Sequence, residues 1–310
     1  MEQVNVGRSG LRVSRVGLGC NNFGWSIDAE ASRRVVDRAL DAGVTLFDTA
    51  DYYGSPPGRS EEVLGELLKG RRDQAVVATK FGLPFQGGPP DNSRGFILRA
   101  VEASLQRLQT DRIDLYMIHW PDVRTPMEET LRALDDLIAS GKVLYIACSN
   151  LAPWRIVESK WIAEKLRQPG FIAAQDEYSL LARGAEKDLV PALSAYGMSL
   201  IPYFPLASGL LSGKYLNEGA EGRLQSNFLK LGNRFLTEAN VARARKLADY
   251  AQQHGHSLLE LAMSWLAAQP VVSGIIAGAT KPEQVEQNVA AASWALTREQ
   301  LGEIDALLAA

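Results

Sequence analysis

Four side chains of different chemistry stand at the ends of short apolar segments. Asp48 ends the apolar run at residues 44–47, and Tyr53 lies five positions beyond it in TLFDTADYYG. Lys80 ends QAVVATK, and His119 ends IDLYMIH. Apolar runs of this length are typical of buried strands, which need no charged group in order to end. A carboxylate, a phenol, an ammonium and an imidazole at such positions therefore indicate a site of chemistry.

These four groups can together exchange a proton with a carbonyl group. The phenol of a free tyrosine has a pKa of about 10, and a neighbouring ammonium lowers the pKa of a phenol because it favours the phenolate. We expect Lys80 to act on Tyr53 in this way, while Asp48 keeps the ammonium charged and oriented. His119 can donate to the carbonyl oxygen that faces Tyr53. Nothing in this set carries hydride, so the pattern predicts a redox cofactor.

Each of the four residues also has a purely structural interpretation. Asp48 can form a strand-end turn, and His119 can be a core histidine with satisfied hydrogen bonds. Tyr53 can be a half-buried packing residue, and Lys80 can extend to solvent. If all four residues had only structural roles, their presence together on neighbouring strands would need four independent coincidences. A lysine that faces a core is also costly without a counter-ion, so we favour a joint site.

The elements that must position these residues alternate along the chain. Strand-like runs lie at residues 15–20, 44–50, 74–80, 113–119, 142–149, 171–175, 198–203 and 273–278. Helical patterns lie at residues 31–41, 60–69, 96–108, 127–140, 154–166, 186–196, 239–254 and 257–268. This alternation predicts an α/β chain whose residues 1–310 form one domain, a (β/α)8 TIM barrel with an N-terminal β-hairpin and extra C-terminal helices.

In such a barrel the C-terminal ends of the strands meet at one rim. Period-two counting turns Asp48, Lys80 and His119 inward at this rim. The turn GRSG at residues 7–10 predicts a hairpin that plugs the opposite mouth. The irregular stretch at residues 213–237 is expected to fold over a ligand.

The composition argues against several classes of function. The net charge of −3 offers nothing for a nucleic acid or an anionic membrane. Neither a signal peptide nor an apolar run of 18 residues is found. Cys20 and Cys148 fit two buried free thiols in a reducing compartment, which predicts a cytoplasmic protein. The chain has three histidines and no HExxH or CxxC pattern, so we expect no metal.

The order of the motifs resembles the aldo-keto reductase family over essentially the whole chain. GVTLFDTADYYG resembles the Asp-x4-Tyr segment of the family, VVATKFG its lysine strand and IDLYMIHWPD its histidine strand. GKVLYIACSN, QDEYSLLAR, YFPLASGLLSGKY and GATKPEQVEQN resemble its successive cofactor segments. The resemblance implies metal-free, NAD(P)(H)-dependent reduction of aldehydes or ketones, or the reverse oxidation, with Tyr53 as the acid and base.

The resemblance also implies a cofactor site at the same rim. Ser149, Asn150 and Gln175 would hold the nicotinamide amide; the alternative for Ser149 and Asn150 is an ordinary helix cap. Tyr203 would stack on the nicotinamide ring, and residues 205–211 would pass the pyrophosphate. The complete set implied for the cofactor is Ser149, Asn150, Gln175, Tyr203, Pro205, Leu206, Ser208, Gly209, Leu211, Lys214, Arg223, Gly278, Thr280, Gln284 and Asn288.

The segment GATKPE after the last strand has two interpretations. Thr280 and Glu283 predict a capping box that opens a helix, and a helix N-terminus can bind the phosphate of the adenosine end of the cofactor. The other interpretation is a capped helix without a ligand. The segment alone does not choose between them, and together with the other cofactor segments it favours the phosphate site.

The sequence does not clearly indicate whether the cofactor is NADP or NAD. Many family members have a Lys–Ser pair and an Arg that grip the 2′-phosphate of NADP, where this chain has Gly278–Ala279 and Gln284. Lys214 or Arg223 can supply that charge, or both can be solvated loop residues. NADP(H) stays favoured, with NAD(H) as the other option.

Aromatic residues in the rim loops predict the substrate pocket, and their side chains suit an aldehyde, a ketone or a sugar carbonyl. They are Trp25, Tyr52, Phe81, Phe85 and Trp120. The main alternative function is a redox sensor or regulatory subunit, because the potassium-channel β-subunits of this family bind the cofactor, keep the four residues and turn over slowly. A barrel hydrolase without a cofactor is a third possibility. The sequence predicts neither the oligomeric state nor the physiological substrate.

Overall fold

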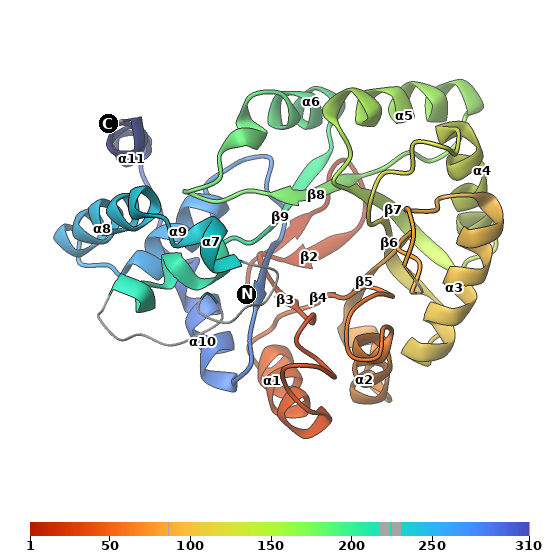
Figure 1. Cartoon of the computed structure of the whole chain (residues 1–310), viewed down its shortest axis with the longest axis horizontal. Coiled ribbons are helices and arrows are strands. Elements are labelled where there is room, and N and C mark those ends of the chain that lie inside the picture. The colour runs from red at the N-terminus through yellow and green to blue at the C-terminus, as the bar shows by residue number, and fades with distance from the viewer. Residues whose placement is uncertain (86, 217–223, 225–230, 310) are drawn as a thin grey trace.

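The structure is a computed structural model, and it describes residues 1–85, 87–216, 224 and 231–309. An eight-stranded parallel sheet forms its centre (Figure 1). They are β3 (Val16–Gly19), β4 (Leu46–Asp48), β5 (Val76–Phe81), β6 (Ile113–Ile118), β7 (Val143–Ser149), β8 (Ala173–Glu177), β9 (Ser199–Tyr203) and β10 (Ile275–Gly278). Each lies within a few residues of its predicted range.

The sheet closes on itself. Its strands follow the order β10-β3-β4-β5-β6-β7-β8-β9. Between β9 and the segment that leads into β10, Leu200 N donates to Val271 O (2.7 Å) and Ser273 N donates to Leu200 O (3.2 Å). The predicted (β/α)8 TIM barrel is therefore confirmed, and the C-terminal ends of all eight strands surround one mouth.

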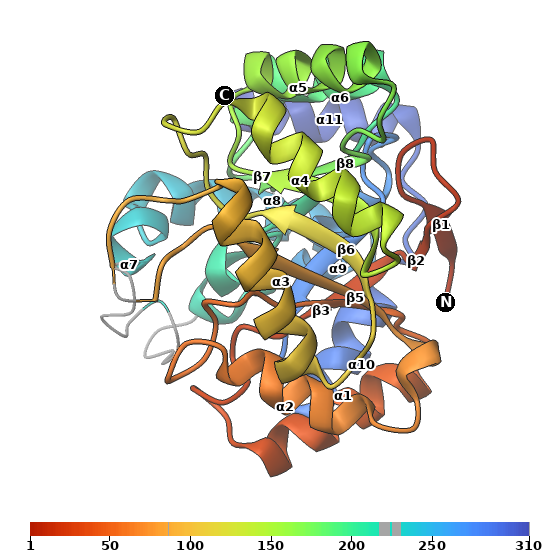
Figure 2. The same ribbon diagram turned by 90° about the vertical axis from the view of Figure 1, so that its right-hand side faces the viewer.

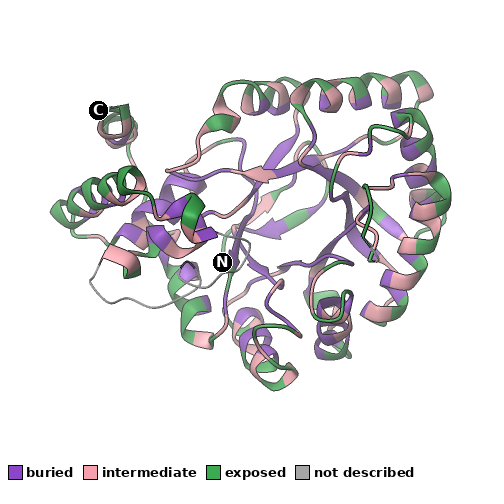
Figure 3. Cartoon of the chain, in the orientation of Figure 1, coloured by how far each residue is buried: buried purple, intermediate pink, exposed green. Residues whose placement is uncertain are grey.

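Helices surround the barrel, and Figure 3 shows their buried faces turned toward the strands. They are α1 (Ala29–Asp41), α2 (Arg59–Leu68), α3 (Arg94–Leu108), α4 (Met127–Ala139), α5 (Pro153–Leu166), α6 (Leu189–Tyr196), α7 (Leu231–Phe235), α8 (Glu238–Gln253), α9 (Leu258–Ala267), α10 (Pro282–Ala291) and α11 (Arg298–Ala309). The helix α6 begins three residues later than predicted, because residues 184–186 form a separate 3-10 turn.

Two apolar layers hold the barrel together. The outer layer fills the space between the strands and the helices and includes Val77, Tyr116 and Cys148. The inner layer fills the barrel and includes Ala78 and Leu115. Because strand side chains alternate between the two layers, Lys80 lies on the inner side with Ala78, as predicted.

A hairpin of β1 (Gln3–Asn5) and β2 (Arg12–Ser14) covers the N-terminal end of the barrel. Val6, Leu11 and Val13 of this hairpin are buried in the inner apolar layer. Figure 2 shows the hairpin at the end of the barrel opposite to α7. The predicted plug is confirmed, and it leaves the C-terminal mouth for the site. Among the described residues, no helix is long and apolar enough to cross a membrane.

Candidate active site

A buried ion pair lies at the mouth of the barrel, at the ends of two adjacent strands. Asp48 ends β4, and Lys80 is the next-to-last residue of β5. Lys80 Nζ donates to both carboxylate oxygens of Asp48, each at 2.8 Å, and to the carbonyl of Thr49 at 2.7 Å. The side chain of Lys80 is 0% exposed. These three acceptors fix the direction of the ammonium and supply the counter-ion that a buried cation needs.

Tyr53 and His119 meet above this ion pair. Lys80 Nζ lies 5.0 Å from the centroid of the Tyr53 ring. The rings of Tyr53 and His119 meet edge to face, with centroids 5.6 Å apart. The loop that carries Tyr53 is anchored to the start of α2, because the Tyr53 carbonyl accepts from Gly58 N and Ser60 N at 3.1 Å each. The four residues predicted from the sequence therefore converge at one rim.

The electrostatics of the site keep the lysine charged and the histidine neutral. Burial by itself would lower the pKa of Lys80, but the charge of Asp48 and hydrogen bonds to Asp48 and Tyr53 raise this pKa above its usual value. Burial, assisted by the charge of Lys80, lowers the pKa of His119 to about 3. At neutral pH the site therefore holds a cation beside the phenol and an uncharged imidazole that can donate one N–H.

Gln175 connects the ion pair to the far side of the mouth. It lies on β8, is only 3% exposed, and its Nε2 donates to Asp48 Oδ1 at 2.8 Å. Ser149 Oγ, at the end of β7, donates to the carbonyl of Gln175 at 2.7 Å. Two of the side chains expected to hold a nicotinamide amide are thus connected to each other and, through Gln175, to Asp48.

Asn150 and Tyr203 continue this chain of contacts. Asn150 Nδ2 donates to the carbonyl of His119 and to Ser149 Oγ, both at 3.0 Å. Tyr203 OH donates to Asn150 Oδ1 at 2.9 Å. Burial and the nearby carboxylates Asp176 and Glu177 raise the pKa of Tyr203 to about 12, so its hydroxyl stays protonated and remains a donor at neutral pH.

The loop after β9 is the expected pyrophosphate segment, and its backbone is unusual. Ala207, Ser208 and Gly209 all have positive φ angles, and Gly209 is the only one whose residue type adopts this region freely. The N–H groups of Gly209 and Leu211 donate to Leu206 O at 2.8 and 3.1 Å, so both are engaged within the loop. Ser208 Oγ is buried and has no partner among the described residues. An oxygen acceptor from a bound molecule would satisfy it.

The expected adenosine-phosphate end differs from the prediction in one respect. The helix α10 begins at Pro282, two residues after Thr280, so the predicted capping box of Thr280 and Glu283 is wrong. Instead, Gln284 Oε1 accepts from Thr280 N at 2.7 Å and from Thr280 Oγ1 at 3.1 Å. Proline is favoured at the first helical position, so the N-cap is Lys281 and the third residue of the helix is Gln284, where the prediction had Thr280 and Glu283.

The other expected cofactor residues lie in different environments. Asn288 is buried and Gly278 is exposed. Lys214 is exposed, with its Nζ 5.6 Å from the Tyr215 ring centroid. Pro205 and Leu211 are buried, and Leu206 is partly buried. Arg223 lies outside the described residues.

Comparison with known proteins gives the family of this chain. Residues 15–309 match the model of the aldo/keto reductase family. The chain belongs to the aldo/keto reductase family. It is an oxidoreductase, since relatives over nearly its whole length are named as reductases.

Three relatives of this aldo/keto reductase illustrate the range of names in the family. L-glyceraldehyde 3-phosphate reductase of Escherichia coli O157:H7 is 37% identical over 98% of this chain and 92% of its own length. A probable voltage-gated potassium channel subunit beta of Oryza sativa subsp. japonica is 37% identical over 99% of this chain and 97% of its own length. Versiconal hemiacetal acetate reductase of Aspergillus parasiticus is 33% identical over 97% of this chain and 95% of its own length.

Aromatic side chains stand around the mouth of this aldo/keto reductase. Trp25, Tyr52, Phe85 and Trp120 lie in the loops that follow β3, β4, β5 and β6, and each is 43–47% exposed. Tyr52 and Phe85 meet edge to face with centroids 6.5 Å apart. Phe81 is different, because it is fully buried in the outer apolar layer. Its ring packs on the ring of Tyr116, with centroids 4.7 Å apart. We therefore leave Phe81 out of the pocket.

The sequence reasoning missed a buried charged cluster beside the strand ends that carry Asp48 and Lys80. Glu61 of α2 accepts from Thr79 Oγ1 at 2.6 Å and from Arg107 Nε at 2.7 Å. Burial and the charge of Glu61 raise the pKa of Asp51 well above its usual value. Asp51 follows Asp48 in the same motif, so its acidic type was visible in DTAD, but only the fold brings it to Glu61.

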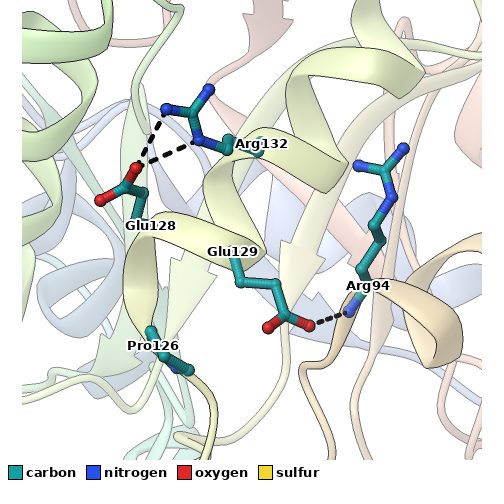
Figure 4. A pocket seen from close by; sticks show the side chains of 5 residues that line it. All are labelled: Arg94, Pro126, Glu128, Glu129 and Arg132. Carbon is teal, nitrogen blue, oxygen red and sulfur yellow. Dashed lines mark hydrogen bonds and ion pairs between the residues drawn. The ribbon is translucent and has the colours of Figure 1, made fainter.

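A surface depression of about 340 Å³ lies at the N-termini of α3 and α4, away from the four residues above. Arg94, Pro126, Glu128, Glu129 and Arg132 line it (Figure 4). Arg132 Nη2 pairs with Glu128 Oε1 at 3.0 Å, and Glu129 Oε1 accepts from Arg94 N at 2.9 Å. The guanidinium of Arg94 pairs with Asp136 of α4. None of the residues predicted for the site lines the depression, so it is not a candidate site. Within the described part of the chain, no group of side chains suits a metal ion.

Proposed function

We propose that this aldo/keto reductase reduces the carbonyl group of an aldehyde or ketone to an alcohol, or performs the reverse oxidation, with Tyr53 as the proton donor. One observation carries the proposal. A fully buried ammonium, held by Asp48 and by the carbonyl of Thr49, lies 5.0 Å from the centroid of the Tyr53 ring. In a buried setting such a cation strongly favours the phenolate that forms when Tyr53 gives up its proton.

The residues of the chain divide the work on the substrate. Tyr53 OH and the neutral imidazole of His119 bind the substrate carbonyl oxygen together, which orients and polarises it. Tyr53 transfers its proton to this oxygen, and Lys80 stabilises the remaining phenolate. Asp48 stabilises the ammonium and keeps it in place. In the oxidative direction the same phenolate takes the proton from the alcohol.

A bound nicotinamide dinucleotide would supply or accept the hydride. The described residues suit such a group. Gln175, Asn150 and Ser149 offer amide and hydroxyl groups beside the catalytic four, and Tyr203 offers a ring that can stack on the nicotinamide. Ser208 Oγ, which has no partner in the part of the chain that the structure describes, suits a pyrophosphate oxygen.

We propose that the other end of the cofactor extends toward Gly278, Thr280, Gln284 and Asn288. NADP(H) remains our favoured nucleotide, with Lys214 or Arg223 as the candidate cation for a 2′-phosphate. NAD(H) is the other option, because Gln284 is neutral and already accepts from Thr280.

The exposed aromatic side chains at the mouth support a proposal for the substrate pocket. Trp25, Tyr52 and Trp120, together with Phe85, form flat apolar walls suited to an organic carbonyl compound. A regulatory subunit with slow turnover is the alternative function, and it is favoured by the similarity to a probable potassium-channel subunit beta. The two functions differ in the steady-state rate over a panel of aldehydes.

The substitution Tyr53→Phe tests the proposal. It removes the proton donor and keeps the ring, so we expect the rate of NADPH-dependent reduction of 4-nitrobenzaldehyde to fall by about 10²- to 10⁴-fold. Cofactor binding, measured by quenching of tryptophan fluorescence, should be unchanged. Tyr196→Phe, which changes the tyrosine at the end of α6 in the same way, is the matched control and should keep the rate. Full activity of the Tyr53 variant would refute the role of its hydroxyl, and near-zero wild-type turnover beside tight cofactor binding would favour the regulatory function.

A further inference from the structure

The turn after β6 places His119 directly before Trp120, which is a proposed wall of the substrate pocket. Two asparagine side chains hold the consecutive carbonyl groups of this turn. Asn150 Nδ2 donates to the carbonyl of His119 at 3.0 Å. Asn92 Nδ2 donates to the carbonyl of Trp120, also at 3.0 Å. Asn150 follows β7 and Asn92 follows β5, and these strands are the two neighbours of β6, so the turn is held from both sides.

The backbone of Asn92 is fixed independently of its side chain. Its N–H donates to Asp122 Oδ2 at 3.1 Å, and its carbonyl accepts from Thr130 Oγ1 of α4 at 2.8 Å. Asn92 is only 4% exposed. Because both bonds are made by the main chain, they remain when the side chain is shortened. The contact of Asn92 with Trp120 can therefore be removed while the loop after β5 stays attached to the turn after β6.

The amide of Asn92 has a clear preferred orientation. Its Oδ1 lies against the backbone of Gly82, where an added Cβ would be 2.5 Å from this oxygen. Oδ1 is buried and has no partner among the described residues. If the amide were turned over, Oδ1 would face the carbonyl of Trp120, and two acceptors would meet without a proton between them. The nitrogen therefore points to Trp120, and this bond is the specific contact of the side chain.

We propose that Asn92 is a positioning residue, which fixes the backbone of Trp120 so that the indole forms a wall of the substrate pocket and favours aromatic aldehydes over small aliphatic ones. The inference deepens the proposed function and rests on it, because Trp120 is taken to contact the substrate. Asn92 is almost fully buried, and its influence on the reaction passes through the position of Trp120.

The contacts of His119 separate this role from proton transfer. His119 N donates to the carbonyl of Phe81 at 2.8 Å, and Asn150 holds the His119 carbonyl. Both contacts remain when Asn92 is changed. The side chain of Trp120 is in a different situation, because the residue is 44% exposed and few neighbours confine its ring. Loss of the bond from Asn92 should therefore weaken the binding of a substrate that packs on this ring and leave the reduction of a small aldehyde unchanged.

The first experiment compares two aldehydes in Asn92→Ala, with NADPH as the cofactor. The KM for 4-nitrobenzaldehyde should rise about two- to tenfold, the equivalent of one ordinary hydrogen bond. The kcat for this aldehyde, and both constants for propanal, should stay at their wild-type values. Asn5→Ala is the matched control, because Asn5 Nδ2 donates to the carbonyl of Ser9 at 2.8 Å in the hairpin at the other end of the barrel. It should change neither aldehyde. An equal loss for both aldehydes in Asn92→Ala would overturn the proposal.

A double-variant cycle shows whether the effect passes through Trp120. Trp120→Ala by itself should raise the KM for 4-nitrobenzaldehyde, because it removes the proposed wall. Adding Asn92→Ala to this variant should raise the KM no further, since the group that Asn92 positions is already gone. If the two changes instead multiply, Asn92 acts through another part of the molecule and the proposal is wrong.

The last experiment needs neither substrate nor cofactor. The six tryptophans are labelled as 5-fluorotryptophan, and the fluorine NMR signal of Trp120 is identified by its loss in Trp120→Phe. In Asn92→Ala this signal should shift or broaden while the signals of the buried core stay in place. An unchanged Trp120 signal, or a shift of all six, would overturn the positioning role. A wild type that reduces neither aldehyde would instead contradict the proposed function, and the NMR spectra would still decide whether Asn92 positions Trp120.

Discussion

Removal of the buried ammonium has an effect whose size follows from the structure. Lys80→Met keeps an unbranched side chain of similar length but leaves the Asp48 carboxylate without its cation. The Asp48 side chain is only 6% exposed, and its remaining side-chain donor is Gln175 Nε2 at 2.8 Å. Breaking one half of a buried ion pair costs about 3–5 kcal/mol. With a urea slope of about 3 kcal/mol/M, the unfolding midpoint should fall by about 1–2 M.

A double variant separates stability from catalysis. Asp48→Asn/Lys80→Met removes both charges. Replacing a whole buried ion pair by uncharged groups often leaves the free energy of unfolding almost unchanged. We expect urea unfolding, followed by tryptophan fluorescence, to return near the wild-type midpoint. The rate of aldehyde reduction should stay about 10²- to 10⁴-fold low in both variants, because neither has a cation beside Tyr53. A wild-type midpoint for Lys80→Met alone, or a restored rate in the double variant, would refute the reasoning.

Two further predictions concern His119 and the packing of α2 on α3. The pKa of about 3 for His119 means that NMR of labelled histidine should find its ring neutral from pH 8 down to about pH 4, and a ring that titrates near 6.5 would contradict the buried environment described here. Gly65→Ala places a Cβ 2.5 Å from the backbone of Leu108, so we expect a loss of about 1–3 kcal/mol in thermal unfolding. The matched change Gly302→Ala, where nothing lies within 4 Å, should gain up to about 1 kcal/mol, and equal effects at both positions would show that the contact is not tight.

The sequence predicted the fold because the barrel is built from a local pattern. Each strand is a short apolar run, each helix repeats its apolar residues every three or four positions, and their alternation has one common solution. The ends of the helices were harder to predict where capping side chains determine them. Thr280 and Glu283 match a capping box in their spacing, but Pro282 starts the helix and Gln284 accepts the hydrogen bonds instead.

Side-chain direction was predictable only inside the strands. Lys80 could be assigned to the inner layer because residues alternate strictly there. Phe81, the next residue, turns outward onto Tyr116 for the same reason, although its place beside the rim suggested a pocket wall. In loops no such period exists, so the exposure of Trp25 and Trp120 at the mouth became known only from the structure.

The sequence by itself determined the chemical groups of this protein and the strand ends that carry them. The carboxylate, phenol, ammonium and imidazole can be read directly from the sequence. The alternation of strands and helices implies that the ends of the strands share one rim. Tertiary structure alone decided how these groups are connected. Gln175 reaches Asp48 across 127 residues of sequence, and Ser149 lies beside Gln175 because two strands pair in one register. Such contacts depend on closure of the sheet, and no spacing within a single segment encodes them.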